Sequence, residues 1–170
     1  SRNMKAIKKF LSKDKFNNIK KILEDPRFPY YYQSSFLPSK PDEKWKNCDF
    51  FFCHTLFKKE GQSSEDKIVE AVLYPITEKL NCKKIIRAKV NLYTNQHEHV
   101  ESNFHVDTDD SNIKIAIFSV GTNNGWTEFE SGKKFLSKEN SIVLFNSNKK
   151  HKAVTQTDTK IRINININYE

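Results

Sequence analysis

The sequence predicts one mainly β domain, a jelly roll with flanking helices and an N-terminal helical support. Three observations lead to this prediction. From residue 85 onward, short runs of alternating or β-branched residues follow one another, separated by turn-forming residues. Helical spacing of apolar residues is confined to the first 84 residues. The length of 170 residues suits a single domain, and thirteen Phe and six Tyr supply bulky side chains for its core.

The first half of the chain is expected to be helical and aromatic. Residues 4–24 carry apolar side chains near helical spacing, and Pro26 ends the pattern because a residue before proline avoids the helical region. Residues 26–62 are rich in proline and aromatic side chains, which indicates irregular structure and short strands packed on a core. A second helix is expected to start after Ser63 and to run to about Leu80, and Pro75 is a site where it would kink.

The second half is expected to consist of short strands. They are predicted at residues 85–93, 98–107, 112–120, 126–130, 141–146, 151–157 and 160–169. Regular turns between short strands favour a sandwich or barrel. The last strand alternates strictly, with Ile on one face and Arg162, Asn164, Asn166 and Asn168 on the other. We therefore expect one domain over residues 1–170, with 1–84 as helical and aromatic support and 85–170 as the jelly-roll core.

The sequence His105-Val106-Asp107 is the strongest candidate for a functional site. A His and an Asp two residues apart on a strand point their side chains to the same face. His151 comes from a distant strand and completes a set of two imidazoles and one carboxylate. Such a set is a 2-His-1-carboxylate facial triad, which holds non-heme Fe(II) and leaves positions open for a co-substrate and O2.

Two other groups of ligand-type side chains compete with this triad. His97 and His99 offer two imidazoles at the spacing that cupin-type metal sites use, but no glycine-rich context surrounds them. Zinc is suggested weakly by Cys48, Cys53 and His54, because a fourth ligand and the usual spacing are missing. The triad is therefore the preferred interpretation.

Polar side chains on two predicted strands are candidates for a co-substrate site. Arg162 is one of only four Arg in a Lys-rich chain, and its planar fork suits a dicarboxylate bound at the iron. Asn91 and Tyr93 share a strand face with Arg87 and Lys89. Such a face is ordinarily solvated, but here it could line the cavity, where the amide and the phenol could hydrogen-bond a carboxylate. The roles of Arg87 and Lys89 stay open.

Charge and cysteine content bear on partners and compartment. The formal net charge is +8, yet the lysines are spread along the chain, which favours a compositional origin over a nucleic-acid patch. Three Cys indicate a reducing cytosol rather than a disulfide framework. No apolar run approaches the roughly 18 residues that span a bilayer. We expect a soluble, cytoplasmic protein without a membrane partner.

These residues resemble the 2-oxoglutarate- and Fe(II)-dependent oxygenases. The likeness covers about Arg87 to Asn168, a double-stranded β-helix that is a cupin-like jelly roll. It implies Fe(II) held by the triad, 2-oxoglutarate as co-substrate with its distal carboxylate on Arg162, and O2 as oxidant. The whole chain is similar to the compact version carried by T4-like marine bacteriophages, which implies action in the host cytoplasm.

Two branches of this family share pieces of the sequence. The stretch Gly125-Trp126-Thr127-Glu128-Phe129 is similar to a motif of prolyl-4-hydroxylase-like members, in which the Thr helps to hold 2-oxoglutarate; the likeness assigns that role to Thr127. The chain departs from the motif in Trp126, which replaces a Gly, and in Arg162, where those members use Lys. The pieces Asn91-Leu92-Tyr93 and Arg162-Ile163-Asn164 are similar to AlkB-type nucleic-acid demethylases, whose second terminal Arg is absent here. This likeness adds Asn164 to the residues expected to bind the co-substrate.

The resemblance therefore implies the cofactor chemistry and leaves the substrate open. The main expectation is an enzyme that hydroxylates a C–H bond, with prolyl hydroxylation of a protein as the leading reaction. The alternatives are an AlkB-like nucleic-acid demethylase and a jelly-roll binding module without activity. The substrate is a protein side chain, a nucleic acid or a small molecule, and the oligomeric state is open.

Overall fold

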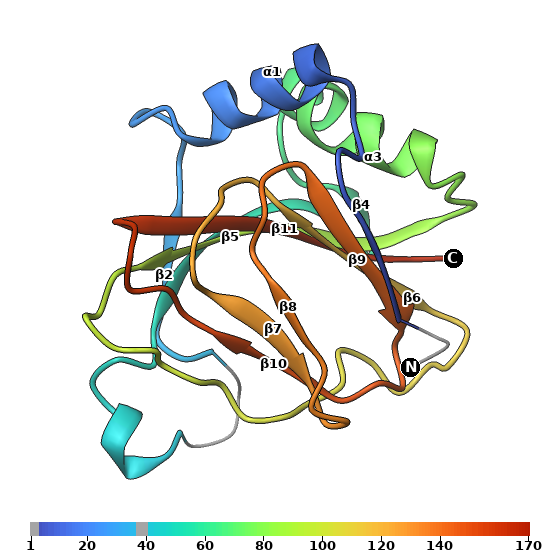
Figure 1. The fold of residues 1–170 in the computed structure, drawn as a ribbon. Coiled ribbons are helices and arrows are strands. Elements are labelled where there is room, and N and C mark those ends of the chain that lie inside the picture. The colour runs from blue at the N-terminus through green and yellow to red at the C-terminus, as the bar shows by residue number, and fades with distance from the viewer. Residues whose placement is uncertain (1–3, 37–40) are drawn as a thin grey trace.

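The structure is a computed structural model that describes residues 4–36 and 41–170. Two antiparallel sheets lie one over the other, and helices cover the outer face of the larger sheet (Figure 1). The larger, eight-stranded sheet contains, in spatial order, β1 (Met4–Ile7), β9 (Ser141–Asn146), β6 (Lys114–Ser119), β11 (Ile161–Tyr169), β5 (Ile85–Thr94), β3 (Phe51–Lys58) and β2 (Tyr31–Gln33), with β4 (Gly61–Gln62) beside β3. The smaller sheet contains β10 (His151–Val154), β7 (Trp126–Phe129) and β8 (Lys134–Leu136).

The main core lies between the larger sheet and its helical cover. The cover consists of α1 (Lys13–Leu23), α2 (Asp66–Ile68), the π-helical turn η2 (Val69–Leu73) and α3 (Tyr74–Lys79). Ile163, Ile165 and Ile167 of β11 belong to this core. The Phe118 ring of β6 meets Phe16 of α1 edge-on, at 6.2 Å between ring centres. Because side chains alternate along a strand, the Arg and Asn side chains of β11 face the smaller sheet instead.

The prediction of one helix over residues 4–24 is wrong in its first part. Residues Met4–Ile7 form β1, which pairs with β9 and places Met4 opposite Phe145. Met4 is buried in a second apolar cluster that also contains Phe145. Pairing with a distant strand therefore overrides the local helical spacing. The helix begins only after Ser12, whose hydroxyl accepts a hydrogen bond from the Lys15 N–H at 3.4 Å.

The predicted second helix forms, but it is interrupted. The π-helical turn η2 separates α2 from α3, and Pro75 lies in the first turn of α3. Proline has no N–H to donate and its ring clashes with the carbonyl four residues before it, so the regular α-helical pattern breaks there. Two short elements complete the first half: β2 and the 3-10 helix η1 (Glu43–Trp45). No helix in the described ranges is long and apolar enough to cross a membrane.

Six of the seven strands predicted in the second half are present, and the prediction for residues 98–107 is wrong. Only isolated bridges link this segment to β10, at Glu101–Val154 and His105–His151. A side chain replaces a backbone partner here: the Ser102 hydroxyl accepts from the Ala153 N–H at 3.0 Å. The three-residue strand β8, which follows Gly132 at a φ of 93°, was not predicted.

Candidate metal centre

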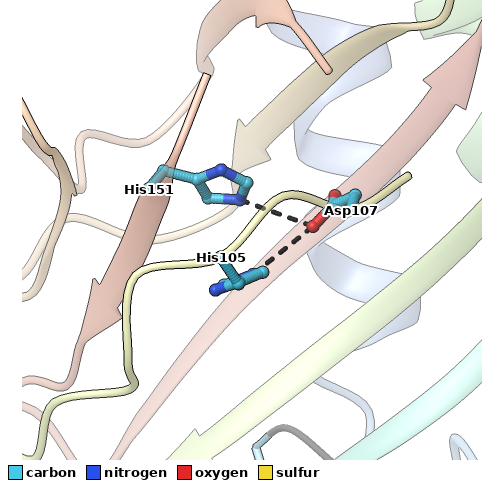
Figure 2. A group of neighbouring side chains, drawn as sticks. All are labelled: His105, Asp107 and His151. Atoms are coloured by element: carbon cyan, nitrogen blue, oxygen red, sulfur yellow. Dashed lines mark ion pairs between the residues drawn. The ribbon is translucent and has the colours of Figure 1, made fainter. Parts of the chain in front are cut away.

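The two predicted His ligands and the predicted Asp converge between the sheets (Figure 2). His151 begins β10, whereas His105 and Asp107 come from the irregular segment before β6. Asp107 Oδ1 lies 3.4 Å from His105 Nε2 and 3.5 Å from His151 Nε2. The backbone bridge between His105 and His151, rather than strand alternation, brings the segments together.

Hydrogen bonds orient both imidazoles toward Asp107. His105 Nδ1 lies 2.9 Å from the Asn103 carbonyl oxygen, and His151 Nδ1 lies 3.1 Å from that of Lys149. A carbonyl oxygen only accepts, so each Nδ1 carries a proton and the Nε2 atom of each ring faces the carboxylate. The two Nε2 atoms and the carboxylate oxygen lie within 4.8 Å of one another, so the residues fit a divalent metal ion.

The electrostatics of the cluster keep Asp107 ionised. Burial favours the neutral acid, but hydrogen bonds and charge from the two imidazoles outweigh it and hold the pKa of Asp107 well below its usual range. Burial also opposes the charged form of His105, yet the contact with Asp107 and the bond to the Asn103 carbonyl raise its pKa. The site therefore presents a carboxylate that can attract either a proton or a metal cation.

Asn166 of β11 holds the other oxygen of the carboxylate. Its Nδ2 donates to Asp107 Oδ2 at 3.3 Å, which leaves Oδ1 facing the two imidazoles. The His151 ring is fixed from behind by Phe145, at 4.8 Å between ring centres. Sequence reasoning did not assign a role to Asn166, although it noted that Asn166 shares a strand face with Arg162 and Asn164.

Replacing Asn166 with Ala is expected to weaken binding of Mn(II) about 10–100-fold, because the loss of a partner behind a ligand usually costs that much. Calorimetric titration of the purified variant measures the affinity. Asn168→Ala is the matched control, since Asn168 lies two residues further along the same strand face and its Oδ1 has no hydrogen-bond partner. Equal affinities for the Asn166 variant and the wild type would contradict the orienting role.

A cavity of about 600 Å³ adjoins the triad. Four of the residues predicted to bind a co-substrate line it, namely Asn91, Tyr93, Thr127 and Asn164. Asn91 Nδ2 donates to Asn164 Oδ1 at 3.2 Å, so the two amides form a pair across β5 and β11. Burial raises the pKa of Tyr93 to about 12, which keeps its phenol a neutral hydrogen-bond donor.

Arg162 lies beside this cavity rather than in its wall. The side chain is 2% exposed, and its guanidinium carbon is 5.9 Å from the centre of the Tyr93 ring. Nη1 donates to the Val154 carbonyl at 2.8 Å, whereas Nε is buried without a partner. Among the described side chains no carboxylate forms an ion pair with it, and burial lowers its pKa. Because an unpaired buried cation is costly, the arrangement fits an anionic ligand beside Tyr93.

Gly125 makes room for Arg162. A Cβ at this position would lie 3.0 Å from Arg162 Cδ and 3.1 Å from the Val154 carbonyl oxygen. Gly125→Ala is therefore expected to lower the free energy of unfolding by about 1–3 kcal/mol, the usual cost of overpacking. At Gly121 a Cβ would meet only Asn123 Nδ2 at 4.0 Å, so Gly121→Ala is the control. Denaturant unfolding measures the free energy of unfolding of both variants. Equal values would show that the Arg162 side chain can move aside for the added methyl group.

The competing ligand groups do not form sites. His99 Nδ1 bonds the Thr155 carbonyl at 2.7 Å, and its ring packs 5.0 Å from Trp126. Both ring nitrogens of His54 are occupied, by the Pro29 carbonyl and the Ser64 hydroxyl. In the described part of the chain, the triad is the only group of three His, Cys, Asp or Glu placed to hold a metal. Trp126 packs outside the cavity, with its Nε1 donating to Glu128.

The chain has the jelly-roll fold of the 2-oxoglutarate- and Fe(II)-dependent oxygenases, as the sequence predicted. It is similar to an oxidoreductase of the 2OG-Fe(II) oxygenase family from Burkholderia pseudomallei, at a TM-score of 0.68 and 9% identity over 100% of this chain and 86% of that one. It is also similar to the viral collagen prolyl hydroxylase of Paramecium Bursaria Chlorella virus-1, solved with 2OG (TM-score 0.60, 14% identity, 98% and 94% of the two chains).

A third similar structure is a prolyl-4-hydroxylase from Pseudomonas putida, with a TM-score of 0.64 and 12% identity over 99% of this chain and 92% of that one. No family model matches the chain, and no curated protein sequence matches it either. The likeness is therefore one of three-dimensional structure.

Proposed function

We propose that this protein is a non-heme Fe(II)- and 2-oxoglutarate-dependent dioxygenase that hydroxylates a C–H bond. The observation that carries the proposal is the convergence of two imidazole Nε2 atoms on Asp107 Oδ1, at 3.4 and 3.5 Å, inside an oxygenase fold. Two His and one carboxylate on one side of a metal are typical of Fe(II) sites that bind a co-substrate and O2. In this role the metal ligands are His105, Asp107 and His151.

The reaction consumes 2-oxoglutarate, O2 and a substrate C–H, and yields succinate, CO2 and the hydroxylated product. Iron in the site would supply the oxygen activation. The protein would contribute ligand orientation through the Nδ1 hydrogen bonds and Asn166, together with the cavity beside the triad.

The co-substrate would lie between the triad and Arg162. The guanidinium would pair with the distal carboxylate, and this anion would compensate the buried charge that has no acidic partner in the described structure. Tyr93 and Thr127 would donate hydroxyl hydrogen bonds to the same carboxylate, since both line the cavity. The Asn91–Asn164 amide pair would form the floor between this end and the metal.

Prolyl hydroxylation of a protein is the leading candidate reaction. The likeness of residues 125–129 to the prolyl-4-hydroxylase motif supports it, as do two similar structures that are named prolyl hydroxylases. In this proposal residues 1–170 form one oxygenase domain. AlkB-like demethylation is the second candidate, supported by the Asn91/Tyr93 and Arg162/Asn164 pairs. A bacteriophage origin and a cytoplasmic location stay predictions of the sequence.

Succinate formation tests the proposal. The wild-type protein is incubated with Fe(II) and 2-oxoglutarate under air without substrate, and slow succinate release that depends on the metal is expected. Calorimetry of 2-oxoglutarate against the Mn(II)-loaded protein gives an independent readout of binding. Absence of both signals would favour a binding module without activity. Mass spectrometry of a proline-rich peptide after incubation then tests for one added oxygen atom per modified proline.

A further inference from the structure

The pairing of β5 with β11 arranges the cavity as a ladder. Arg162 lies opposite Tyr93, and Asn164 lies opposite Asn91. Further along the same two strands, Asn166 lies opposite Lys89 and Asn168 lies opposite Arg87. Directly opposed residues point to the same face, and alternate residues follow at about 7 Å intervals. The cavity therefore runs from an Arg162 end, where Tyr93 forms the wall, to an Arg87 end.

The metal centre lies part of the way along this ladder. Asn166 donates a hydrogen bond to Asp107 and pairs with Lys89 across the two strands. The Asn166–Lys89 pair therefore lies at the same position along the strands as the triad. Lys89 is thus beside the metal site, and Arg87 lies one step beyond it, on the side away from Arg162. Because 2-oxoglutarate would occupy the Arg162 side, Arg87 and Lys89 face the part of the cavity left for the substrate.

Neither cation is neutralised by the protein. Arg87 and Lys89 are half-buried and line the cavity, and in the described structure neither forms an ion pair. Asp107 is the only carboxylate in the cavity wall as described. Both charges also act on a buried neighbour: burial raises the pKa of the Cys53 thiol, and Lys89 and Arg87 oppose part of that rise. Lys152, in contrast, is paired with Glu101 at 2.9 Å.

The charges in the cavity do not balance without a negatively charged substrate. If the proposed function holds, the two positive charges of Fe(II) and the one of Arg162 are balanced by Asp107 and by the two carboxylates of 2-oxoglutarate. The positive charges of Arg87 and Lys89 then remain without a counterpart in a partly desolvated cavity. Such a site favours a substrate with about two negative charges, and an Arg fork beside a Lys point charge suits a phosphate group.

We propose that Arg87 and Lys89 bind a phosphate of a nucleotide substrate, which is either a free nucleotide or a unit of a nucleic-acid strand. The two unpaired cations in the cavity wall therefore favour the nucleic-acid candidate over prolyl hydroxylation. Aromatic rings in the cavity wall support the nucleotide. Phe36 and Phe51 line the same cavity as Arg87 and Lys89. Aromatic side chains that share a site with cations form a surface on which bases stack.

Calorimetry on the Mn(II)- and 2-oxoglutarate-loaded protein tests the proposal with three probes. They are a nucleoside monophosphate, the matching nucleoside, and a short single-stranded oligonucleotide. The monophosphate is expected to bind at least about tenfold more tightly than the nucleoside, because a hydrogen bond between charged groups is lost with the phosphate. A much tighter oligonucleotide identifies a strand as the substrate, whereas equal affinities identify the free nucleotide.

Variants locate the binding. Arg87→Gln with Lys89→Gln is expected to weaken monophosphate binding about tenfold or more, and Arg87→Lys with Lys89→Arg is expected to retain most of it. The control is Lys8→Gln with Lys15→Gln, which removes the same charge from exposed residues on the helical side. Circular dichroism checks that each variant is folded.

Three results would overturn the phosphate subsite. These are no binding of the monophosphate or the oligonucleotide, an equal loss in the control variant, and a glutamate-rich peptide that binds as tightly with the same dependence on Arg87 and Lys89. The titration of 2-oxoglutarate on the same wild-type sample reports the proposed function separately. If 2-oxoglutarate does not bind, the probes are titrated against the unloaded protein, so the two failures are distinguishable.

Discussion

Asp107→Ala is expected to abolish tight binding of Fe(II) or Mn(II), and with it the formation of succinate. The carboxylate supplies the only negative charge of the triad, and its Oδ1 is the atom on which both Nε2 atoms converge. Loss of this carboxylate should weaken metal binding by more than the 10–100-fold that follows removal of a residue behind a ligand. Calorimetric metal titration and succinate assays on the same samples measure the two effects.

The control for this variant is Asp109→Ala. Asp109 is exposed two residues further along the chain, so the change in net charge is the same without a change in the triad. His105→Ala should act in the same direction as Asp107→Ala, because it removes one of the two converging imidazoles. If Asp107→Ala binds Mn(II) as tightly as the Asp109 variant, the metal lies elsewhere and the dioxygenase proposal fails.

Arg162→Met is expected to weaken 2-oxoglutarate binding about 100-fold or more while metal affinity is unchanged. Removing one partner of a buried charge pair costs roughly 3–5 kcal/mol, and each 1.4 kcal/mol is about tenfold in affinity. The metal should be unaffected, because the Arg162 guanidinium contacts Tyr93, Val154 and Trp126 and no member of the triad. Titration of 2-oxoglutarate into the Mn(II)-loaded proteins measures the change.

A shorter ligand makes this test specific. A 2-oxo acid without the distal carboxylate, such as 2-oxobutyrate, should bind wild type and Arg162→Met equally weakly. The affinity of Arg162→Lys for 2-oxoglutarate should fall between those of the wild type and Arg162→Met, since lysine keeps a charge but loses the planar fork. If Arg162→Met weakens both ligands by the same factor, Arg162 supports the cavity wall and does not hold the distal carboxylate.

Local patterns were sufficient for most of the fold. The strict Ile and Asn alternation of residues 161–169 predicted a strand with one face in the core, and Ile163, Ile165 and Ile167 of β11 lie under the helices, whereas Ile161 at the start of the strand is exposed. Two errors have the same cause. Residues 4–7 have helical spacing but pair with β9, and residues 98–107 look like a strand but use side chains such as Ser102 to bond β10. In both segments distant partners outweigh local preference.

The sequence by itself determined the chemistry of this protein: which imidazoles and which carboxylate are available, and which strands carry the polar faces. The tertiary structure alone decided their arrangement. It directs both Nε2 atoms at Asp107, places Asn166 behind that carboxylate, and buries Arg162 beneath Tyr93. It also separates the Arg162 end of the cavity from the end with Arg87 and Lys89. The physical reason is that burial, hydrogen-bond partners and strand register depend on segments far apart in the chain, whereas residue type and alternation are local.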